Sequence, residues 1–168
     1  ALLRRLAREA GDLAMSYIHQ GGAEFWNKTT GGPVTEADLA VNRLCAKELL
    51  GARPEYGWLS EETRDDPAAR QKSRVWVIDP IDGTKAFVSG TYLFGTLIAL
   101  LKDGRPALGV INQPIIGDFL VGTGDQTWLN GRPVRTATCS RIEDAILLTT
   151  DHWQVYREKN GPAFEALS

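Results

Sequence analysis

The sequence predicts an α+β fold in which two N-terminal helices pack on a mostly antiparallel sheet. Two segments with helical spacing of apolar residues come first, at 1–19 and 35–50. Short apolar segments of strand length follow from 56 to 134, separated by turns rich in Gly. Helices followed by hairpin-connected strands favour this class over a βαβ repeat. The 168 residues have the usual size of one domain.

Both predicted helices carry boundary signals. The first presents an apolar stripe and ends at 20–22, after which 25–32 reads as an irregular, hairpin-like connection. In the second helix, Thr35 is a suitable N-cap, and acidic residues occupy the first turn, where the helix dipole favours negative charge. Gly51 is expected to end this helix. We expect both helices to bury an apolar face in the core.

The strands are expected to follow one another along the chain. A strand at 56–60 precedes a solvated loop at 63–73, and the next strand begins at Val75. The segments 93–101 and 107–113 flank an Asp-Gly sequence, which predicts a hairpin. Further strands are expected at 118–122, 126–129 and 142–150, with a turn at 130–131 and loop and helix from 151 to 168.

The most informative segment is Asp79-Pro80-Ile81-Asp82-Gly83-Thr84, which directly follows an apolar strand. Its two carboxylates can face one cavity only if the backbone turns sharply, and Pro80 would stiffen that turn because its ring fixes φ. The Ile81 carbonyl could also reach a metal in this geometry. Gly83 permits close backbone approach, and a helix that opens at Thr84 would offer free N–H groups to a phosphate. The segment predicts a metal site beside an anion site.

Other acidic residues also fall at the ends of predicted elements. Asp38 lies in the first turn of the second helix, and Glu61 and Glu62 follow a predicted strand. Taken singly, helix capping explains Asp38 and a solvated loop explains the two glutamates. Their presence together with Asp79 and Asp82 indicates a shared site for Mg²⁺, which prefers oxygen ligands.

Composition excludes several classes of partner. The net charge of −2, from 19 basic and 21 acidic residues, leaves no basic patch for nucleic acid or an anionic membrane. The longest apolar run, 97–101, is too short to cross a bilayer. Cys45 and Cys139 are distant and unpatterned, which favours a reducing cytoplasmic location over a disulfide scaffold. His19 and His152 stand alone, so zinc is not expected.

Three motifs occur in order along the chain, at 34–38, 60–62 and 76–84. Together they resemble the inositol monophosphatase superfamily of Mg²⁺-dependent phosphatases, and the resemblance extends from the first helix to about Thr150. The segments 87–90, 94–100, 109–114 and 129–133, with Lys85, look most like histidinol-phosphate phosphatases. The resemblance implies the N-terminal part of a layered αβαβα sugar-phosphatase fold. It also implies two or three Mg²⁺ per site, a small phosphorylated substrate and a homodimer.

The resemblance also implies a role for each motif residue. The implied metal ligands are Glu61, Asp79, the Ile81 carbonyl and Asp82, with Asp79 bridging two metals. Thr84, oriented by Asp38, would activate a water molecule as the nucleophile, because a threonine hydroxyl alone is a poor base. Asp82 and the backbone N–H groups of Gly83 and Thr84 would hold the substrate phosphate.

One part of the superfamily pattern is missing. The superfamily supplies a further aspartate from a Trp-Asp motif in its second half, and no such motif follows Thr150. Trp153 stands between His152 and Gln154 and is no substitute. We therefore expect 1–168 to be the N-terminal metal- and phosphate-binding domain of a longer protein, with the C-terminal α/β part absent. The start at Ala1 in place of Met agrees with this expectation.

Alternative functions stay open at this point. Hydrolysis of histidinol phosphate, a step of histidine biosynthesis, is the preferred reaction, and inositol monophosphate and 3′-phosphoadenosine 5′-phosphate are alternative substrates. An inactive metal- or phosphate-binding fragment is an alternative from another class. A haloacid dehalogenase-type phosphatase would need a nucleophilic aspartate two residues before Asp82. That position is Pro80, which cannot attack phosphorus.

Overall fold

The structure is a computed structural model that describes residues 2–29, 32–91 and 93–146. The chain divides into two compact units, Ala1–Val134 and Arg135–Ser168. All α-helices and strands of the described residues lie in the first unit. The described part of the second unit contains one short 3₁₀ helix, Ile142–Asp144.

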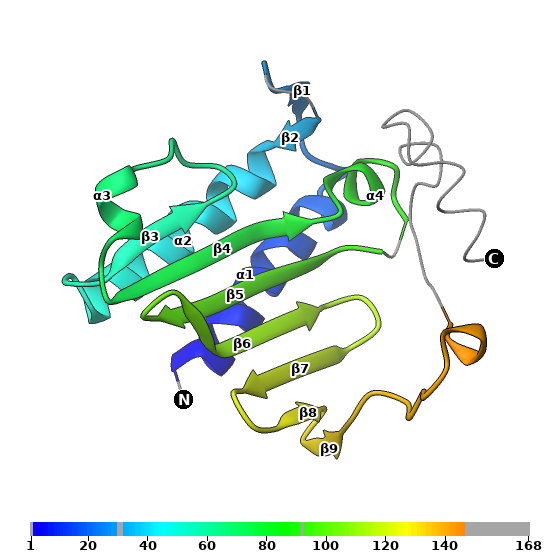
Figure 1. Cartoon of the computed structure of the whole chain (residues 1–168). Coiled ribbons are helices and arrows are strands. Elements are labelled where there is room, and N and C mark those ends of the chain that lie inside the picture. The colour runs from blue at the N-terminus through cyan, green and yellow to red at the C-terminus, as the bar shows by residue number, and fades with distance from the viewer. Residues whose placement is uncertain (1, 30–31, 92, 147–168) are drawn as a thin grey trace. The chain divides into compact units, whose positions relative to one another are not determined.

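A seven-stranded sheet forms the centre of the first unit, in the order β3-β4-β5-β6-β7-β8-β9 (Figure 1). The strands are β3 (Gly57–Ser60), β4 (Arg74–Asp82), β5 (Gly95–Lys102), β6 (Arg105–Gln113), β7 (Asp118–Thr123), β8 (Thr127–Leu129) and β9 (Arg132–Val134). β3 pairs with β4 in parallel, and every later pair is antiparallel. The predicted α+β class and the mostly antiparallel sheet are confirmed.

Tight hairpins explain why the spatial order of these strands follows the chain. Between β5 and β6, Lys102 pairs with Arg105, which leaves Asp103 and Gly104 as the two-residue turn. Both have positive φ, 51° and 74°. A turn with this conformation matches the twist of the flanking strands, and Asp-Gly is one of its preferred sequences.

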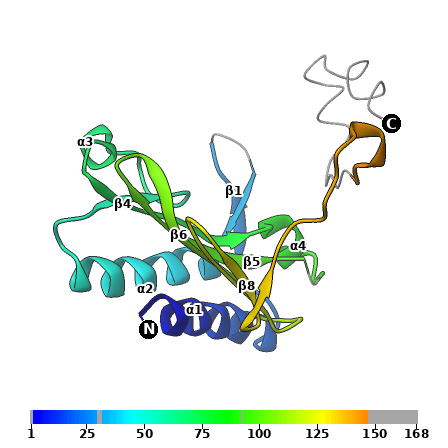
Figure 2. The same ribbon diagram turned by 60° about the horizontal axis from the view of Figure 1, so that its bottom comes forward.

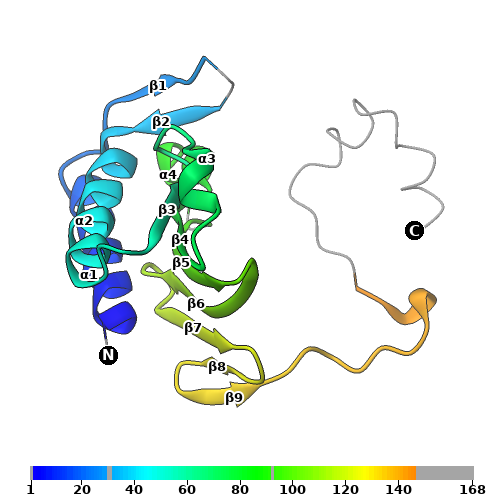
Figure 3. The same ribbon diagram turned by 60° about the vertical axis from the view of Figure 1, so that its left-hand side comes forward.

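Two long helices cover one face of the sheet (Figures 2 and 3). α1 (Leu2–His19) lies against β5 and β6, and α2 (Glu36–Ala52) lies against β3 and β4. A separate hairpin of β1 (Phe25–Asn27) and β2 (Pro33–Thr35) joins them, as the sequence predicted. None of the described helices combines the length and the apolar character that a membrane crossing requires.

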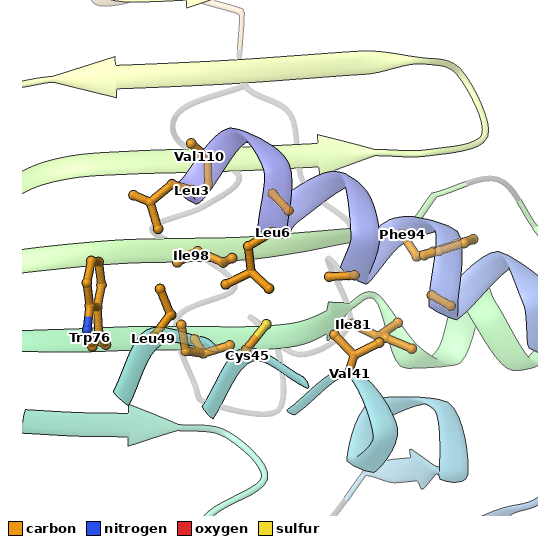
Figure 4. Packing of buried hydrophobic residues seen from close by; sticks show 14 of the residues in the cluster. Leu3, Leu6, Val41, Cys45, Leu49, Trp76, Ile81, Phe94, Ile98 and Val110 are labelled. Atoms are coloured by element: carbon orange, nitrogen blue, oxygen red, sulfur yellow. The ribbon is translucent and has the colours of Figure 1, made fainter. Parts of the chain in front are cut away.

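The core lies between these helices and the sheet (Figure 4). Leu6 of α1 and Val41 of α2 pack with Ile98 and Val110 of the sheet, and each is at most 3% exposed. Period-two alternation along the strands places these sheet residues on the helix side. Asn112 extends this face, and its buried Nδ2 donates to the Ala7 carbonyl at 2.9 Å. This hydrogen bond ties α1 to β6.

The other face of the sheet carries the alternate apolar residues. Val77, Leu97 and Leu120 are half-buried there, and Ile111 is 39% exposed. These residues line a hollow of about 400 Å³, with Asp79 among its lining residues. The face therefore runs up to the acidic end of β4.

One sequence-based boundary and one loop were wrong. α2 does not end at Gly51 but continues to Ala52, where the Arg53 N–H donates to the Leu49 carbonyl at 2.9 Å. The loop expected at 63–73 contains α3 (Pro67–Arg70), which Asp66 caps through Ala68 N at 2.9 Å.

The strand expected at 142–150 begins as the 3₁₀ helix Ile142–Asp144. Its end at 147–150, and the loop and helix expected at 151–168, lie outside the described residues.

Candidate active site

The candidate site lies where β4 ends, and the local backbone differs from the expected sharp turn at Pro80. β4 continues to Asp82, but Asp79 pairs with Leu97 and Asp82 pairs with Gly95, so β4 holds one extra residue. This is a β-bulge, a position in a sheet where proline is tolerated. The buried Thr96 hydroxyl donates to the Pro80 carbonyl at 2.9 Å and helps to fix the bulge.

The chain reverses at Gly83, directly before α4 (Thr84–Val88). Gly83 has φ 88° and ψ 37°, a left-handed conformation that disfavours residues with a Cβ. A Cβ here would also lie 2.5 Å from the Leu93 carbonyl oxygen. Only glycine satisfies both conditions. The predicted short helix at Thr84 is confirmed, and its first N–H groups lack partners within the helix.

Asp38 and Thr84 are brought together although 46 residues separate them. The Thr84 hydroxyl lies 3.3 Å from Asp38 Oδ1 and 3.0 Å from the Ile81 carbonyl oxygen. Asp38 Oδ2 instead accepts from the Thr35 N–H at 2.8 Å and from the Thr35 hydroxyl at 2.5 Å. The Asp38 N–H donates back to Thr35 Oγ1 at 3.2 Å, which completes a capping box at the start of α2.

Burial sets the protonation behaviour of Asp38. The residue is 1% exposed, and this burial raises the pKa of its carboxyl above the ordinary value. Hydrogen bonds from Thr35 and Thr84 act in the opposite direction. A buried carboxyl with a raised pKa and a hydroxyl next to it is suited to accept a proton from that hydroxyl.

Three further carboxylates of the predicted site surround the end of β4. Burial raises the pKa of Asp79 to about 7, and the nearby charges of Glu61 and Asp82 add to this rise. Asp38 contributes in the same direction. Parallel pairing of Ser60 with Ile78 explains the approach of Glu61, because it places the next residue of each strand side by side. Like charges that crowd in this way favour a bound cation.

Lys28 is a charged residue of this site that sequence reasoning missed. Its ammonium lies 2.9 Å from Glu61 Oε1 and 2.7 Å from Glu62 Oε1. Contacts with the two glutamates outweigh the opposing effect of burial and raise the pKa of Lys28. Lys28 follows directly after β1, and nothing in the residues around it distinguishes it from a surface lysine.

The donor set fits a hard cation such as Mg²⁺, because its groups are carboxylates and one backbone carbonyl. The side chains are not placed as a finished metal cage. Within 2–29, 32–91 and 93–146, no group of three or more His, Cys, Asp or Glu residues is arranged to hold a metal ion. Glu61, one of the predicted ligands, is paired with Lys28.

A carboxylate cluster, a threonine hydroxyl bonded to a buried aspartate and helix N–H groups without partners in the helix are groups that metal-assisted phosphoryl transfer can use. Comparison with known proteins gives the family of the chain. The model of the inositol monophosphatase family matches residues 1–165, and the chain belongs to this family.

Curated relatives carry several phosphatase names. The bifunctional phosphatase IMPL2 of Arabidopsis thaliana is 36% identical over 146 residues, which are 86% of this chain and 42% of the relative. The histidinol-phosphatase of Chlorobaculum parvum is 33% identical over 151 residues, 89% of this chain and 58% of the relative. A 3′(2′),5′-bisphosphate nucleotidase CysQ of Salmonella typhimurium is 36% identical over 129 residues, 74% of this chain and 51% of the relative.

A solved structure gives the same assignment. An inositol monophosphatase from Zymomonas mobilis is 35% identical, with a TM-score of 0.71 over 97% of this chain and 63% of that one. The predicted fold family is therefore confirmed. The chain spans about half the length of the curated relatives that it matches.

Proposed function

We propose that the protein is an Mg²⁺-dependent phosphatase that hydrolyses a small phosphomonoester. The contact of the Thr84 hydroxyl with Asp38 Oδ1, at 3.3 Å, is the observation that carries this proposal. A buried carboxyl gives the hydroxyl proton a place to go, and the capping box holds that carboxyl in position. Asp38 and Thr84 are accordingly the proposed catalytic residues.

Four groups are proposed to hold the metal ions. They are the carboxylates of Glu61, Asp79 and Asp82 and the backbone carbonyl of Ile81. Bound Mg²⁺ would neutralise phosphoryl charge and make a water molecule more acidic. Burial of Asp79 beside Glu61 and Asp82 supports this assignment, because the three carboxylates share a region in which their charges oppose one another.

The remaining chemistry belongs to the protein's own groups. We propose that Thr84 Oγ1 takes a proton from the attacking water while its own proton passes to Asp38 Oδ1. The N–H groups of Gly83 and Thr84, with Asp82 beside them, would orient the phosphate at the start of α4. The left-handed conformation of Gly83, which only glycine fits, supports this arrangement because it keeps side chains away from that point.

Histidinol phosphate is the proposed substrate, as a step of histidine biosynthesis. The support is the similarity to the histidinol-phosphatase of Chlorobaculum parvum. The similarity to a CysQ nucleotidase and to an inositol monophosphatase structure supports the two alternative substrates. We also propose a cytoplasmic homodimer. The free thiols of Cys45 and Cys139 support a reducing compartment, and light scattering after size-exclusion chromatography tests the dimer.

Phosphate release from three substrates tests the function directly. The full-length protein is assayed with histidinol phosphate, inositol monophosphate and 3′-phosphoadenosine 5′-phosphate, each with and without Mg²⁺. We expect turnover that requires Mg²⁺ and is fastest with histidinol phosphate. Faster turnover of another substrate would correct the specificity alone. Mg²⁺ binding without turnover of any substrate would favour the non-catalytic alternative, a module that binds metal or phosphate.

A further inference from the structure

Lys28 places a positive charge in the acidic end of the sheet. Its side chain is 19% exposed and forms ion pairs with Glu61 and Glu62. Burial raises the pKa of both Glu62 and Asp79, and repulsion adds to each rise. Asp38 repels Glu62, and Glu61 repels Asp79, so these carboxylates lie near one another. The ammonium therefore offsets part of the repulsion within the carboxylate cluster of Asp38, Glu61, Glu62, Asp79 and Asp82.

The two ion pairs of Lys28 have different surroundings. The Glu62 side chain is 4% exposed, and its ion pair is the shorter of the two, at 2.7 Å. Its backbone N–H donates to Ser60 Oγ at 3.2 Å, and the Ser60 hydroxyl donates to Asn42 of α2 at 2.7 Å. Glu62 is thus held in place on several sides.

Glu61 forms the weaker and more accessible pair. Its side chain is 51% exposed, and its oxygen lies 2.9 Å from Lys28 Nζ. An exposed ion pair contributes little to stability and can exchange partners at low cost. The part-buried pair Lys28–Glu62 is costlier to break, because either partner left alone would be a poorly solvated, uncompensated charge.

The backbone of Lys28 is fixed by the small hairpin. β1 pairs with β2 in antiparallel register, and the Lys28 N–H donates to the Gly32 carbonyl at 2.9 Å. β2 ends at Thr35, which is the N-cap of α2. The hairpin therefore connects the position of the ammonium with the element that orients Asp38.

We propose that Lys28 is the internal counter-ion of the metal-free site, and that a divalent cation takes Glu61 from it while Glu62 keeps the ammonium in place. This inference rests on the proposed function, since it takes Glu61 as a metal ligand. Lys28 is a positioning residue in this scheme. It holds the carboxylates together before the metal binds, and it weakens metal binding because its contact with Glu61 must first be broken.

A charge-neutral double variant separates this competition from a general effect of charge. K28M/E62Q replaces both partners of the part-buried pair and leaves the net charge unchanged. Release of Glu61 from the ammonium is expected to tighten Mg²⁺ binding about two- to fivefold, the scale of an exposed ion pair. Lys28→Met alone should also lower the melting temperature without metal by several degrees, because it leaves Glu62 buried and unpaired. Lys28→Arg should restore most of that loss.

Isothermal titration of the full-length protein with Mg²⁺, and with Mn²⁺ as a second probe, measures these affinities. Lys102→Met is the matched control, since Lys102 is exposed at the far end of β5. It should bind Mg²⁺ as the wild type does. Binding by K28M/E62Q that equals or falls below the wild-type affinity would overturn the role of Lys28 and leave the proposed function intact. A wild-type protein that binds neither cation would overturn both.

Discussion

Asp38 combines two tasks because its two carboxylate oxygens face different partners. Oδ2 accepts from the N–H and the hydroxyl of Thr35 and so caps α2. Oδ1 faces the Thr84 hydroxyl at 3.3 Å. The hydrogen bonds of the cap restrict the rotamer of Asp38, so the second oxygen is aimed at Thr84 before any ligand binds. The stability of one helix end and the geometry of the site therefore depend on one side chain.

The proposed role of Thr84 predicts a loss of rate without a loss of metal binding. Thr84→Ala removes the hydroxyl that would pass a proton to Asp38, and kcat should fall on the order of 10²- to 10⁴-fold. The affinity for Mg²⁺ should stay near the wild-type value, because the proposed ligands remain. Steady-state kinetics and isothermal titration measure the two quantities. Thr84→Ser keeps a hydroxyl and should retain most of the activity; an unchanged kcat in Thr84→Ala would contradict the role.

Asp82 permits a test of metal ligation in which the fold is preserved. The residue is exposed at the end of β4 and makes no ion pair among the described residues. Asp82→Asn keeps the size of the side chain but removes a charged oxygen, so turnover with Mg²⁺ should be abolished while the melting temperature changes little. Phosphate release and circular dichroism follow the two effects. Activity within a few-fold of the wild type would remove Asp82 from the metal site.

Elements differ in how well the sequence predicted them, and β4 and α3 show the reasons. Two carboxylates that face one cavity on either side of Pro80 predict a sharp turn within 79–84. Pairing of Asp82 with Gly95 of β5 extends β4 to Asp82. The residues around Asp82 do not indicate this pairing, because its partner lies in another strand. α3 has only four residues, too few for periodicity, although Asp66-Pro67 is a typical helix start. By contrast, α1 and α2 are long and amphipathic, and their positions were predicted within two residues.

The α2 cap should couple stability to catalysis. Thr35 is 0% exposed and takes part in both hydrogen bonds of the capping box. Its side chain accepts from the Asp38 N–H, and its own N–H donates to the Asp38 side chain. Thr35→Ala should lower the free energy of unfolding by about 1–2 kcal/mol. It should also reduce kcat, because Asp38 Oδ2 loses the hydroxyl partner that fixes its rotamer. Urea unfolding and steady-state kinetics measure the two losses. Thr35→Ser retains the hydroxyl and is the control. A Thr35→Ala variant that shows the expected loss of kcat but unfolds at the same urea concentration as the wild type would show that the cap is not needed for stability.

The site as a whole results from the convergence of five elements at one end of the sheet. The hairpin, α2, β3, β4 and α4 each contribute a charged or polar group, and α4 contacts β2 beside the end of β4 (Figure 1). The sequence predicted Asp38, Glu61, Asp79 and Asp82 as candidate site residues because motifs mark them. It did not identify Lys28, whose role depends on two ion pairs across more than 30 residues of sequence. Residue types led to the proposed chemistry, and the tertiary arrangement was needed to find the proposed counter-ion.

Burial of Cys45 links the stability of the first unit to pH. Cys45 is 0% exposed in the core, and burial raises the pKa of its thiol to about 12. In the unfolded chain the thiol ionises near its ordinary pKa of 9.0. Between these two values the folded state retains a proton that the unfolded state loses. This contribution to stability is therefore fully present below about pH 9 and declines as the pH rises toward 12, by about 1.4 kcal/mol per pH unit.

Comparison with Cys45→Ala isolates this contribution from other groups that titrate at high pH. The wild type should lose stability faster than the variant between pH 9 and 11, and urea unfolding at each pH measures the difference. Thiol reactivity gives an independent readout, because Cys139 is exposed while Cys45 is buried. Iodoacetamide at pH 8 should modify Cys139 quickly and Cys45 only after denaturation. Equal rates for the two thiols in the native protein would mean that the core between α2 and the sheet opens readily, and the pH dependence would then be lost as well.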